Sequence, residues 1–355
     1  MLSENLRARL ERLNRQALPS EAARQGVQEA ESYLRAAREE RTSGRFSQLA
    51  TTATNAAASR KPVAMAGSSP TPSPPTPSAM LSGEVVATSA GEHWFIRHRV
   101  DEFWPAFAAR YGAWNGAWRA QGDTPDVVAS PRKRATARAR RYAAEVALLG
   151  RALPLGTLFL DLETCGLAGS ALFLVGLLRH DGDHLVLEQL LARNYAEEQA
   201  VLHTLWRAAA QASLLVTFNG KSFDWPLVQD RSTYHRMGRD DSAPPMVELP
   251  HVDVLHHARR RWRQRLPDCR LQTLERFLCG RHRSGDIPGR DIPEAYRRYV
   301  ATGRIDEMQA ILHHNALDLV TLLELAMRLA APVQRVASEI TDVHDPARLA
   351  VDDAA

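Results

Sequence analysis

The sequence predicts an α/β fold in which helices flank a mixed β-sheet, and residues 154–330 carry the evidence. Three strand-like segments come first, and an amphipathic helix, a fourth strand and further helices follow them. The composition agrees, because 45% hydrophobic and 24% charged residues in a chain of 355 are typical of a globular protein with a sizeable core. We therefore expect a sheet-based domain in the second half of the chain.

Short apolar runs that end at turn residues define the expected strands. The run TLFLDLE (157–163) predicts the first strand, and the apolar segments on both sides of the turn at 181–183 predict two more. The run LLVTF (214–218) predicts the fourth strand, which ends at the turn residues Asn219 and Gly220.

Helical periodicity predicts the elements that cover the sheet. Apolar residues recur at helical spacing over 196–212, over 271–280 with a glycine as the stop signal, and over 305–330. The segment 286–300 contains two prolines and predicts a loop followed by one more helix. Together with the strands, these helices make up the domain that we expect at 151–330.

The rest of the chain differs in composition from this domain. Residues 1–48 predict a charged helical arm, which is a candidate to bind a protein partner. Residues 49–83 are rich in Ala, Ser, Thr and Pro, which is typical of a disordered linker. Residues 84–150 contain a strand-like or hairpin segment and a basic helix, and we expect an accessory segment there. Residues 331–355 are expected to form a C-terminal tail.

Charge and apolar patterning limit the location and the partners of the protein. The formal net charge is +4 and the pI is about 9.1, which is compatible with nucleic acid as a partner. No apolar run approaches the ~20 residues that span a bilayer, and the N-terminus lacks an apolar signal-peptide core. Three cysteines are a sparse, odd set that fits a reducing compartment. We expect a cytoplasmic protein with no membrane partner.

Two acidic residues interrupt the first apolar strand. Asp161 and Glu163 are two positions apart, so their side chains project from the same face of the strand. Two like charges so close raise each other's pKa, and buried carboxylates are costly unless they are paired or bind a cation. On an edge strand with this face in water, the pair would carry no function. At the end of a central strand, it predicts a site for a divalent cation.

Two later segments add acidic residues and a histidine. Asp224 lies just after the fourth strand, near the start of the following helix, where a helix-capping role is the alternative. Asp318 lies within the apolar pattern of the last helix, and His314 is on the same helical face four residues earlier. A histidine beside a metal-bound carboxylate can act as a general base for water. A His–Asp pair on a helix surface is the structural alternative.

Four carboxylates from three separate segments form a more specific pattern than any one of them. Such a set can hold two Mg²⁺ or Mn²⁺ ions about 3.5–4 Å apart, the arrangement that hydrolyses phosphodiester bonds. One ion activates water and the other stabilises the leaving oxygen. The predicted metal ligands, which with His314 form the predicted catalytic set, are Asp161, Glu163, Asp224 and Asp318.

Three motifs resemble those of a known superfamily. DLET (161–164), NGKSFD (219–224) and HHNALD (313–318) are similar to the acidic motifs of the DEDD superfamily of 3′–5′ exonucleases. More closely, residues 154–330, about half of the chain, resemble the bacterial YprB-like ribonuclease H-like family. This resemblance implies a ribonuclease H-like fold and metal-dependent 3′–5′ exonuclease activity.

The resemblance also implies a role for each acidic residue. Asp161 and Glu163 match the first motif, Asp224 the second and Asp318 the third. The N-x-x-x-F-D motif usually accompanies a tyrosine at the water-orienting position, which here corresponds to a histidine. The histidine form of the superfamily would select His313, so the chain offers two candidates. Helical geometry favours His314 over His313.

Other residues near these motifs are candidates for substrate contacts. Asn219 and Lys221 are predicted to bind substrate, with loop shape and a solvated turn as their structural alternatives. Phe223 and Trp225 have rings that can stack on a base, but burial in the core is the favoured interpretation. Two basic runs are predicted to hold the phosphate backbone, with solvated helix faces as the alternative: PRKRATARARR (131–141) and ARRRWRQR (258–265).

The sequence thus predicts a hydrolase of phosphodiester bonds, a 3′–5′ exonuclease that acts on a single strand or a 3′ end. DNA and RNA both stay open as substrates, because the distinction depends on contacts to the 2′-hydroxyl. Two alternatives remain: a structure-specific endonuclease on the same core, and a catalytically silent scaffold that binds nucleic acid.

Overall fold

The computed structural model describes residues 82–119, 136–166, 169–238, 243–283 and 285–331. All of them fall within one compact unit of the chain. The predicted helical arm, the linker up to residue 81 and the tail from residue 332 lie outside the described residues, as do the first five residues of the basic run at 131–141.

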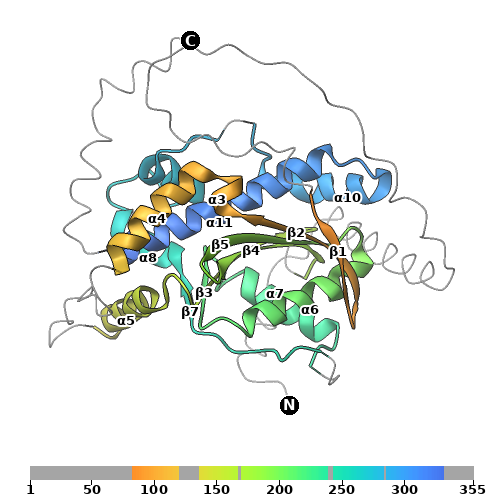
Figure 1. Ribbon diagram of the computed structural model, residues 1–355, viewed down its shortest axis with the longest axis horizontal. Helices are drawn as coiled ribbons and strands as arrows, with labels where there is room; N and C mark the ends of the chain where they lie inside the picture. Colours follow the sequence, from red (N-terminus) through yellow and green to blue (C-terminus); the bar gives the residue numbers. More distant parts are fainter. Residues whose placement is uncertain (1–81, 120–135, 167–168, 239–242, 284, 332–355) are drawn as a thin grey trace, which may run out of the picture. The chain divides into compact units, whose positions relative to one another are not determined.

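A seven-stranded mixed sheet lies at the centre of the unit, which confirms the predicted α/β fold (Figure 1). The strand order is β1-β2-β5-β4-β3-β6-β7. The first five of these pair antiparallel with one another, whereas β6 runs parallel to both β3 and β7. The strands are β1 (Glu84–Thr88), β2 (Gly91–Arg99), β3 (Thr157–Thr164), β4 (Leu172–Asp181), β5 (His184–Leu191), β6 (Leu214–Thr217) and β7 (His251–Asp253).

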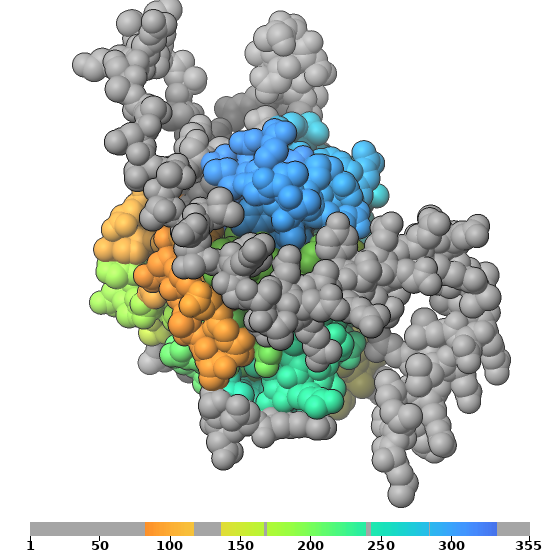
Figure 2. Space-filling view, turned by 90° about the vertical axis from the view of Figure 1, so that its right-hand side faces the viewer, coloured from red at the N-terminus to blue at the C-terminus, as the bar shows by residue number. Residues whose placement is uncertain are grey.

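Helices cover both faces of the sheet. On one face, α11 packs on β3 and β4, and on the other face α6 packs on β2, β4 and β5 (Figure 1). Figure 2 shows the same layers from the side, with α10 and α11 in blue above the orange segment that contains β1 and β2. The helices on the α11 face are α3 (Val100–Phe103), α4 (Pro105–Arg119), α8 (Val254–Trp262), α9 (Leu271–Leu274), α10 (Ile292–Thr302) and α11 (Asp306–Ala330). The opposite face carries α6 (Glu198–Ala209) and α7 (Asp224–Tyr234).

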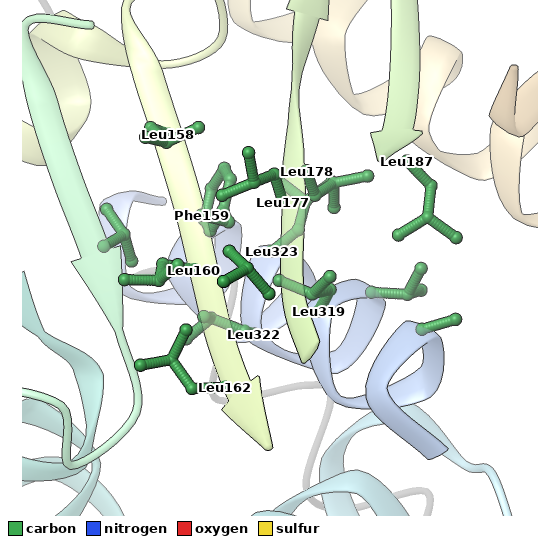
Figure 3. Packing of buried hydrophobic residues seen from close by; sticks show 14 of the residues in the cluster. Leu158, Phe159, Leu160, Leu162, Leu177, Leu178, Leu187, Leu319, Leu322 and Leu323 are labelled. Carbon is green, nitrogen blue, oxygen red and sulfur yellow. The ribbon is translucent and has the colours of Figure 1, made fainter. Parts of the chain in front are cut away.

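The core includes the contact of α11 with β3 and β4. From Leu158 to Leu160 no β3 residue is more than 2% exposed, so this strand is buried on both faces. Of the 25 residues of α11, 18 are buried, which is the pattern of a helix enclosed on nearly all sides. Figure 3 shows the contact between Leu158, Phe159, Leu160 and Leu162 of β3, Leu177 and Leu178 of β4, Leu187 of β5 and Leu319, Leu322 and Leu323 of α11.

The elements predicted from periodicity appear near their expected positions. The predicted turn at 181–183 joins β4 to β5, with Gly182 at a left-handed φ of 58°. The predicted helix at 271–280 is α9, continues as the π-helical segment η3 (Glu275–Cys279), and ends at Gly280 with φ 65°. The predicted last helix is α11. No helix among the described residues is long and apolar enough to cross a membrane.

The segment ahead of the predicted domain builds on the same sheet and core. β2 pairs antiparallel with β5, and β1 pairs with β2 at the edge. The helix α5 (Ala137–Ala152) begins at Thr136, whose hydroxyl accepts a hydrogen bond of 3.2 Å from the backbone N–H of Ala139. α5 packs against α11, so both parts of the segment contact the central layers.

Candidate active site

The end of β3 carries the first two predicted ligands. Asp161 and Glu163 alternate with the buried residues Leu160 and Leu162, so both carboxylates project from one face of the strand. That face is the one that α11 covers, because an α11 side chain hydrogen-bonds Asp161. The pairing with β4 becomes irregular between Glu163 and Thr164, so the regular strand ends directly behind the second carboxylate.

A buried amide holds Asp161 from the helix side. Nδ2 of Asn315, on α11, donates to Oδ2 of Asp161 at 2.8 Å, and Oδ1 of Asn315 accepts from Nε2 of Gln189 at 2.9 Å. Both amides are fully buried. Gly176 of β4 makes room for them, since a Cβ at this position would lie 2.1 Å from Oδ1 of Asn315. Helix and sheet are therefore fixed to each other at the first carboxylate.

A tight loop after β6 places Asp224 as the first residue of α7. Asn219 adopts a left-handed φ of 67°, and its backbone N–H donates to Oδ1 of Asp253 at 2.8 Å. The backbone N–H of Lys221 donates to Oδ2 of the same carboxylate at 3.2 Å. A Cβ on Gly220 would lie 2.7 Å from Oδ2 of Asp224, so the loop approaches this carboxylate too closely for another residue. The fully buried Asp253 thus fixes the loop that presents Asp224.

α11 brings the remaining carboxylate and a histidine to the same place. Nε2 of His314 lies 3.4 Å from Oδ2 of Asp318, one turn further along the helix. Nδ1 of His314 lies 2.8 Å from Oδ1 of Asp286, in the loop before α10. The two ring nitrogens are therefore both directed at carboxylates, and the ring orientation is fixed. Of the two candidate histidines, the structure places His314 against Asp318.

An arginine spans three carboxylates at the rim of this group. Nη2 of Arg283 donates to Oδ1 of Asp318 at 2.5 Å, and Nη1 donates to Oδ2 of Asp286 at 3.2 Å. Its Nε donates to Oε2 of Glu275 at 2.5 Å. The side chain of Arg283 is only 7% exposed, so these charges interact away from bulk water. Asp318 is consequently held between two cationic or potentially cationic groups.

Burial and repulsion between carboxylates raise the pKa of three of the four predicted ligands. Burial raises the pKa of Asp161 well above its usual range, and the negative charges of Asp318, Glu163 and Asp224 raise it further. Burial also raises the pKa of Glu163 to about 8 and that of Asp224 to about 7. Carboxylates in this state favour a proton or a cation, so the group is poised to gain positive charge.

Neighbouring negative charges raise the pKa of the histidine as well. Burial alone would lower the pKa of His314. The hydrogen bond to Asp286 and the charges of Asp318 and Glu163 outweigh burial and raise the pKa to about 9. His314 is therefore an imidazolium at neutral pH as long as no other cation offsets the carboxylates.

The predicted substrate contacts lie on the loop before Asp224 but differ in their surroundings. Nζ of Lys221 pairs with Oε1 of Glu145 on α5 at 2.9 Å, so its charge is engaged there rather than at the carboxylates. Phe223 was expected in the core, but it is 66% exposed, because it lies at the N-cap of α7 where the chain turns outward. Trp225 is buried as expected and packs edge-on against Trp206, with the ring centroids 5.2 Å apart.

The donor chemistry fits a hard divalent cation, because all four predicted ligands are carboxylates, and repulsion among them contributes to the raised pKa values of Asp161 and Glu163. The side-chain arrangement fits less well. Within the described part of the chain, no three His, Cys, Asp or Glu side chains are placed so that they could hold a metal ion. Arg283 and His314 occupy the oxygens of Asp318, so this carboxylate must leave Arg283 before it can turn to a metal.

Three residues of this group were not predicted from the sequence. Asn315 could have been noticed as a polar residue in the apolar pattern of the last helix. Asp286 and Arg283 lie in a loop that has no periodicity, so no local pattern indicates which helix they contact. Only the packing of that loop against α11 brings them to His314 and Asp318.

Comparisons with known proteins concern the same part of the chain. A family model described as the RNase_H superfamily matches residues 158–330, from β3 to the end of α11. The chain is 34% identical over 178 residues to the uncharacterized protein YprB of Bacillus subtilis (strain 168). The aligned residues cover 49% of this chain and 42% of that protein. The chain thus spans less than half the length of this relative.

A solved structure is similar over a comparable share of the chain. It is that of the family B DNA polymerase from the hyperthermophilic archaeon Pyrobaculum calidifontis, with 18% sequence identity and a TM-score of 0.39. The similarity covers 50% of this chain and 24% of the polymerase chain.

Proposed function

Since residues 158–330 of the chain belong to the RNase H superfamily, we propose that this domain is a metal-dependent nuclease. The observation that carries the proposal is the group of half-buried carboxylates from β3, the start of α7 and α11, in which burial and mutual repulsion raise the pKa of Asp161 and Glu163. A fold retains such a costly group when a cation relieves it. Hydrolysis of phosphodiester bonds is the chemistry that four carboxylates and two Mg²⁺ or Mn²⁺ ions support.

Each residue has a proposed role that follows from its position. Asp161, Glu163, Asp224 and Asp318 hold the ions, directly or through water. Bound ions would supply charge to activate a water molecule and to stabilise the leaving oxygen. His314 receives the proton of that water once its pKa has fallen from the value of the metal-free site.

Neighbouring residues would support these roles without touching the reacting bond. Asp286 keeps the His314 ring in one orientation through the 2.8 Å hydrogen bond to Nδ1. Asn315 does the same for Asp161. We propose that Phe223, an exposed ring directly before Asp224, stacks on a base of the substrate. Asn219 and Lys221 are proposed substrate contacts on the same loop, the latter after it leaves Glu145.

The activity is tested by cleavage of labelled DNA, RNA and DNA–RNA hybrid with Mg²⁺ or Mn²⁺. We expect the native chain to cleave at least one of them, and Asp161→Ala to reduce the rate by at least about a thousandfold. The matched control is Asp183→Ala, in the exposed turn between β4 and β5, which should keep full activity. Native protein that cleaves none of the three substrates with either metal would refute the proposal.

The mode of cleavage is proposed to be exonucleolytic from the 3′ end. End-labelled linear substrates and closed circles distinguish this mode from an endonuclease on the same core. Stepwise loss of nucleotides from the 3′ end supports the exonuclease. Cleavage of closed circles would show that exonuclease action is not the complete description.

A second candidate is a nucleic-acid-binding protein without turnover. The ion pair between Arg283 and Asp318 favours it, because a guanidinium there neutralises a carboxylate that the nuclease needs for metal. On this hypothesis the native chain binds nucleic acid but cleaves none, and Mg²⁺ does not change its melting temperature.

A further inference from the structure

We propose that an arginine patch beside the candidate active site binds the phosphate backbone of the nucleic acid that the site cleaves. The patch consists of six exposed arginines: Arg138 and Arg141 of α5, and Arg259, Arg260, Arg263 and Arg265 of α8 and the turn behind it. The inference rests on the proposed function for the identity of its ligand. It adds a second contact surface, and one of its two helices lies outside the residues that match the family model.

α5 and α8 form one surface although they are far apart in the sequence. The rings of Tyr142 on α5 and His257 on α8 pack against each other at a tilt of 33°, with their centroids 4.7 Å apart. The guanidinium of Arg260 lies 4.4 Å from the centroid of the Tyr142 ring. Arg138 is one turn before Tyr142, so it projects from the side of α5 that faces α8. The two basic runs therefore meet.

The charges of the patch are largely unneutralised within the protein. Arg141 pairs with Glu145 at 3.2 Å, but the other five arginines form no ion pair with a carboxylate of the described residues. Arg297 and Arg298 on α10 differ from these arginines, since they lie 2.6 Å from Glu294 and Glu307, respectively. A cluster of unpaired guanidinium groups attracts a polyanion and binds phosphates in bidentate geometry.

A half-buried clasp of Glu145, Lys221 and His257 connects the patch to the candidate site. Glu145 of α5 accepts from Nζ of Lys221 at 2.9 Å and lies 2.8 Å from Nε2 of His257. Burial would raise the pKa of Glu145, but the hydrogen bond and charge of Lys221 and the hydrogen bonds of His257 and Arg141 together outweigh it and lower the pKa. The clasp is thus ionised at neutral pH. Because Lys221 is three residues before Asp224, it fixes α5 and α8 beside the loop that presents this carboxylate.

This placement suits a strand that extends from the site over the patch. Figure 1 shows α5 and α8 on the same side of the unit, next to the β7 edge of the sheet. An acidic site repels a polyanion until cations bind, so a neighbouring positive surface would hold the strand while its end is positioned. Contacts to phosphates carry no sequence information, so the patch fits a nuclease that accepts many sequences.

The test is binding of labelled single-stranded DNA and RNA, measured by fluorescence anisotropy in EDTA over a range of salt concentrations. The triple variant Arg138→Ala/Arg259→Ala/Arg263→Ala leaves Tyr142 and the Glu145 clasp intact. We expect it to weaken binding about tenfold and to reduce the slope of log Kd against log salt by about 2, at roughly 0.7 per phosphate contact. The charge-preserving variant with lysine at the same three positions should restore the slope.

The matched control removes three arginines on other surfaces: Arg99→Ala, Arg207→Ala and Arg304→Ala. Equal loss of affinity in this control, or an unchanged slope in the patch variant, would overturn the proposal, as would native protein that binds neither nucleic acid. Because binding is measured without metal, it is independent of cleavage. If the patch variant binds nucleic acid more weakly, as expected, while the native chain cleaves none of the substrates, the patch proposal stands and only the nuclease proposal is refuted.

Discussion

At the scale of single residues, ionised carboxylates in the candidate site destabilise the folded protein, so we expect neutral replacements to stabilise it. Within the part of the chain that the structure describes, the Glu163 side chain forms no hydrogen bond, and burial raises its pKa to about 8 from an ordinary 4.5. Near pH 8 the unfolded chain ionises this carboxyl group at no cost, whereas in the folded state ionisation is unfavourable. The raised pKa therefore lowers the free energy of unfolding. An amide of the same shape avoids this penalty.

We predict that Glu163→Gln stabilises the metal-free protein. The free energy of unfolding near pH 8 should increase by about 1–3 kcal/mol, while nuclease activity is lost. Chemical denaturation in EDTA measures the change, and Asp183→Asn in the exposed β4–β5 turn is the control. A variant that is less stable than the native chain near pH 8 contradicts this account of the site.

Arg283 is a second residue whose contribution depends on the metal. Its guanidinium pairs with Asp318, Glu275 and Asp286, so Arg283→Gln removes one counter-charge from each. Glu275 then keeps only Arg281 among the described residues, and both aspartates depend on His314. We expect a loss of about 2–4 kcal/mol in EDTA. A larger rise of the melting temperature on addition of Mg²⁺ or Mn²⁺ than in the native chain should accompany it, since Asp318 is then free to bind metal.

Thermal melts with and without each metal test both halves of this prediction. Arg290→Gln is the matched control, because the side chain of Arg290 is 85% exposed and pairs only with the neighbouring Asp291. A metal response that is smaller in Arg283→Gln than in the native chain would indicate that Arg283 helps to form the metal site.

At the scale of secondary-structure elements, the contact between α11 and the sheet positions the chemistry. Asn315 reaches Asp161 only because Gly176 of β4 has no side chain. A Cβ there must displace an amide that is fully buried and that bridges two strands.

We therefore predict that Gly176→Ala destabilises the protein by about 1–3 kcal/mol, because it overpacks the core. It should also lower activity, since Asp161 loses its partner. Urea denaturation measures the first effect. Gly112→Ala on α4 is the control: nothing lies within 4 Å of its Cβ, so this substitution should be neutral or stabilise by up to about 1 kcal/mol. Equal stability of Gly176→Ala and the native chain would contradict the prediction.

The sequence predicts relations within one strand or helix, but it does not predict contacts between distant segments. Alternation placed Asp161 and Glu163 on one face of β3, and helical spacing placed His314 beside Asp318, because both relations depend only on local backbone geometry. The predicted burial of Phe223 was wrong. An aromatic residue next to the start of a helix does not indicate in which direction the chain turns. The partners Asp286 and Arg283 depend on how a loop packs in three dimensions, which no local pattern encodes.

Sheet extension illustrates the same limit. The run that forms β1 and β2 was recognised as strand-like, but its pairing partner β5 lies about a hundred residues away in the chain. The interaction of α5 with α8 likewise depends on Tyr142 and His257, residues that have no motif in common.

At the scale of the whole molecule, the raised pKa values predict how stability depends on pH. Glu163 and Asp224 have pKa values of about 8 and about 7 in the folded state, above their ordinary 4.5 and 3.8. The pKa of His314 is also raised, to about 9 from 6.5. A raised pKa contributes stability that is complete below the unfolded value and is lost as the pH rises through the folded value.

The metal-free protein should therefore become less stable as the pH rises from about 6 to about 8, by on the order of 2 kcal/mol for Glu163 alone. Below about pH 4.5 the trend reverses, because His235 and Arg231 outweigh burial and lower the pKa of Glu198. Its contribution to stability is complete above the ordinary pKa of 4.5 and is lost as the pH falls through the lowered folded value. Melting curves in EDTA across this range test the prediction, and Glu163→Gln should flatten the profile. A stability that increases steadily up to pH 8 would contradict it.

The enclosure of α11 in the core has a consequence for local opening of the site. His314, Asn315 and Asp318 lie on the helix whose residues are most completely buried, so these groups separate only when the core itself opens. Amide hydrogens in the middle of α11 should exchange with solvent only through global unfolding, at the same free energy as β3. Heating should then abolish activity and structure in a single transition, since no partly opened form retains a separated site.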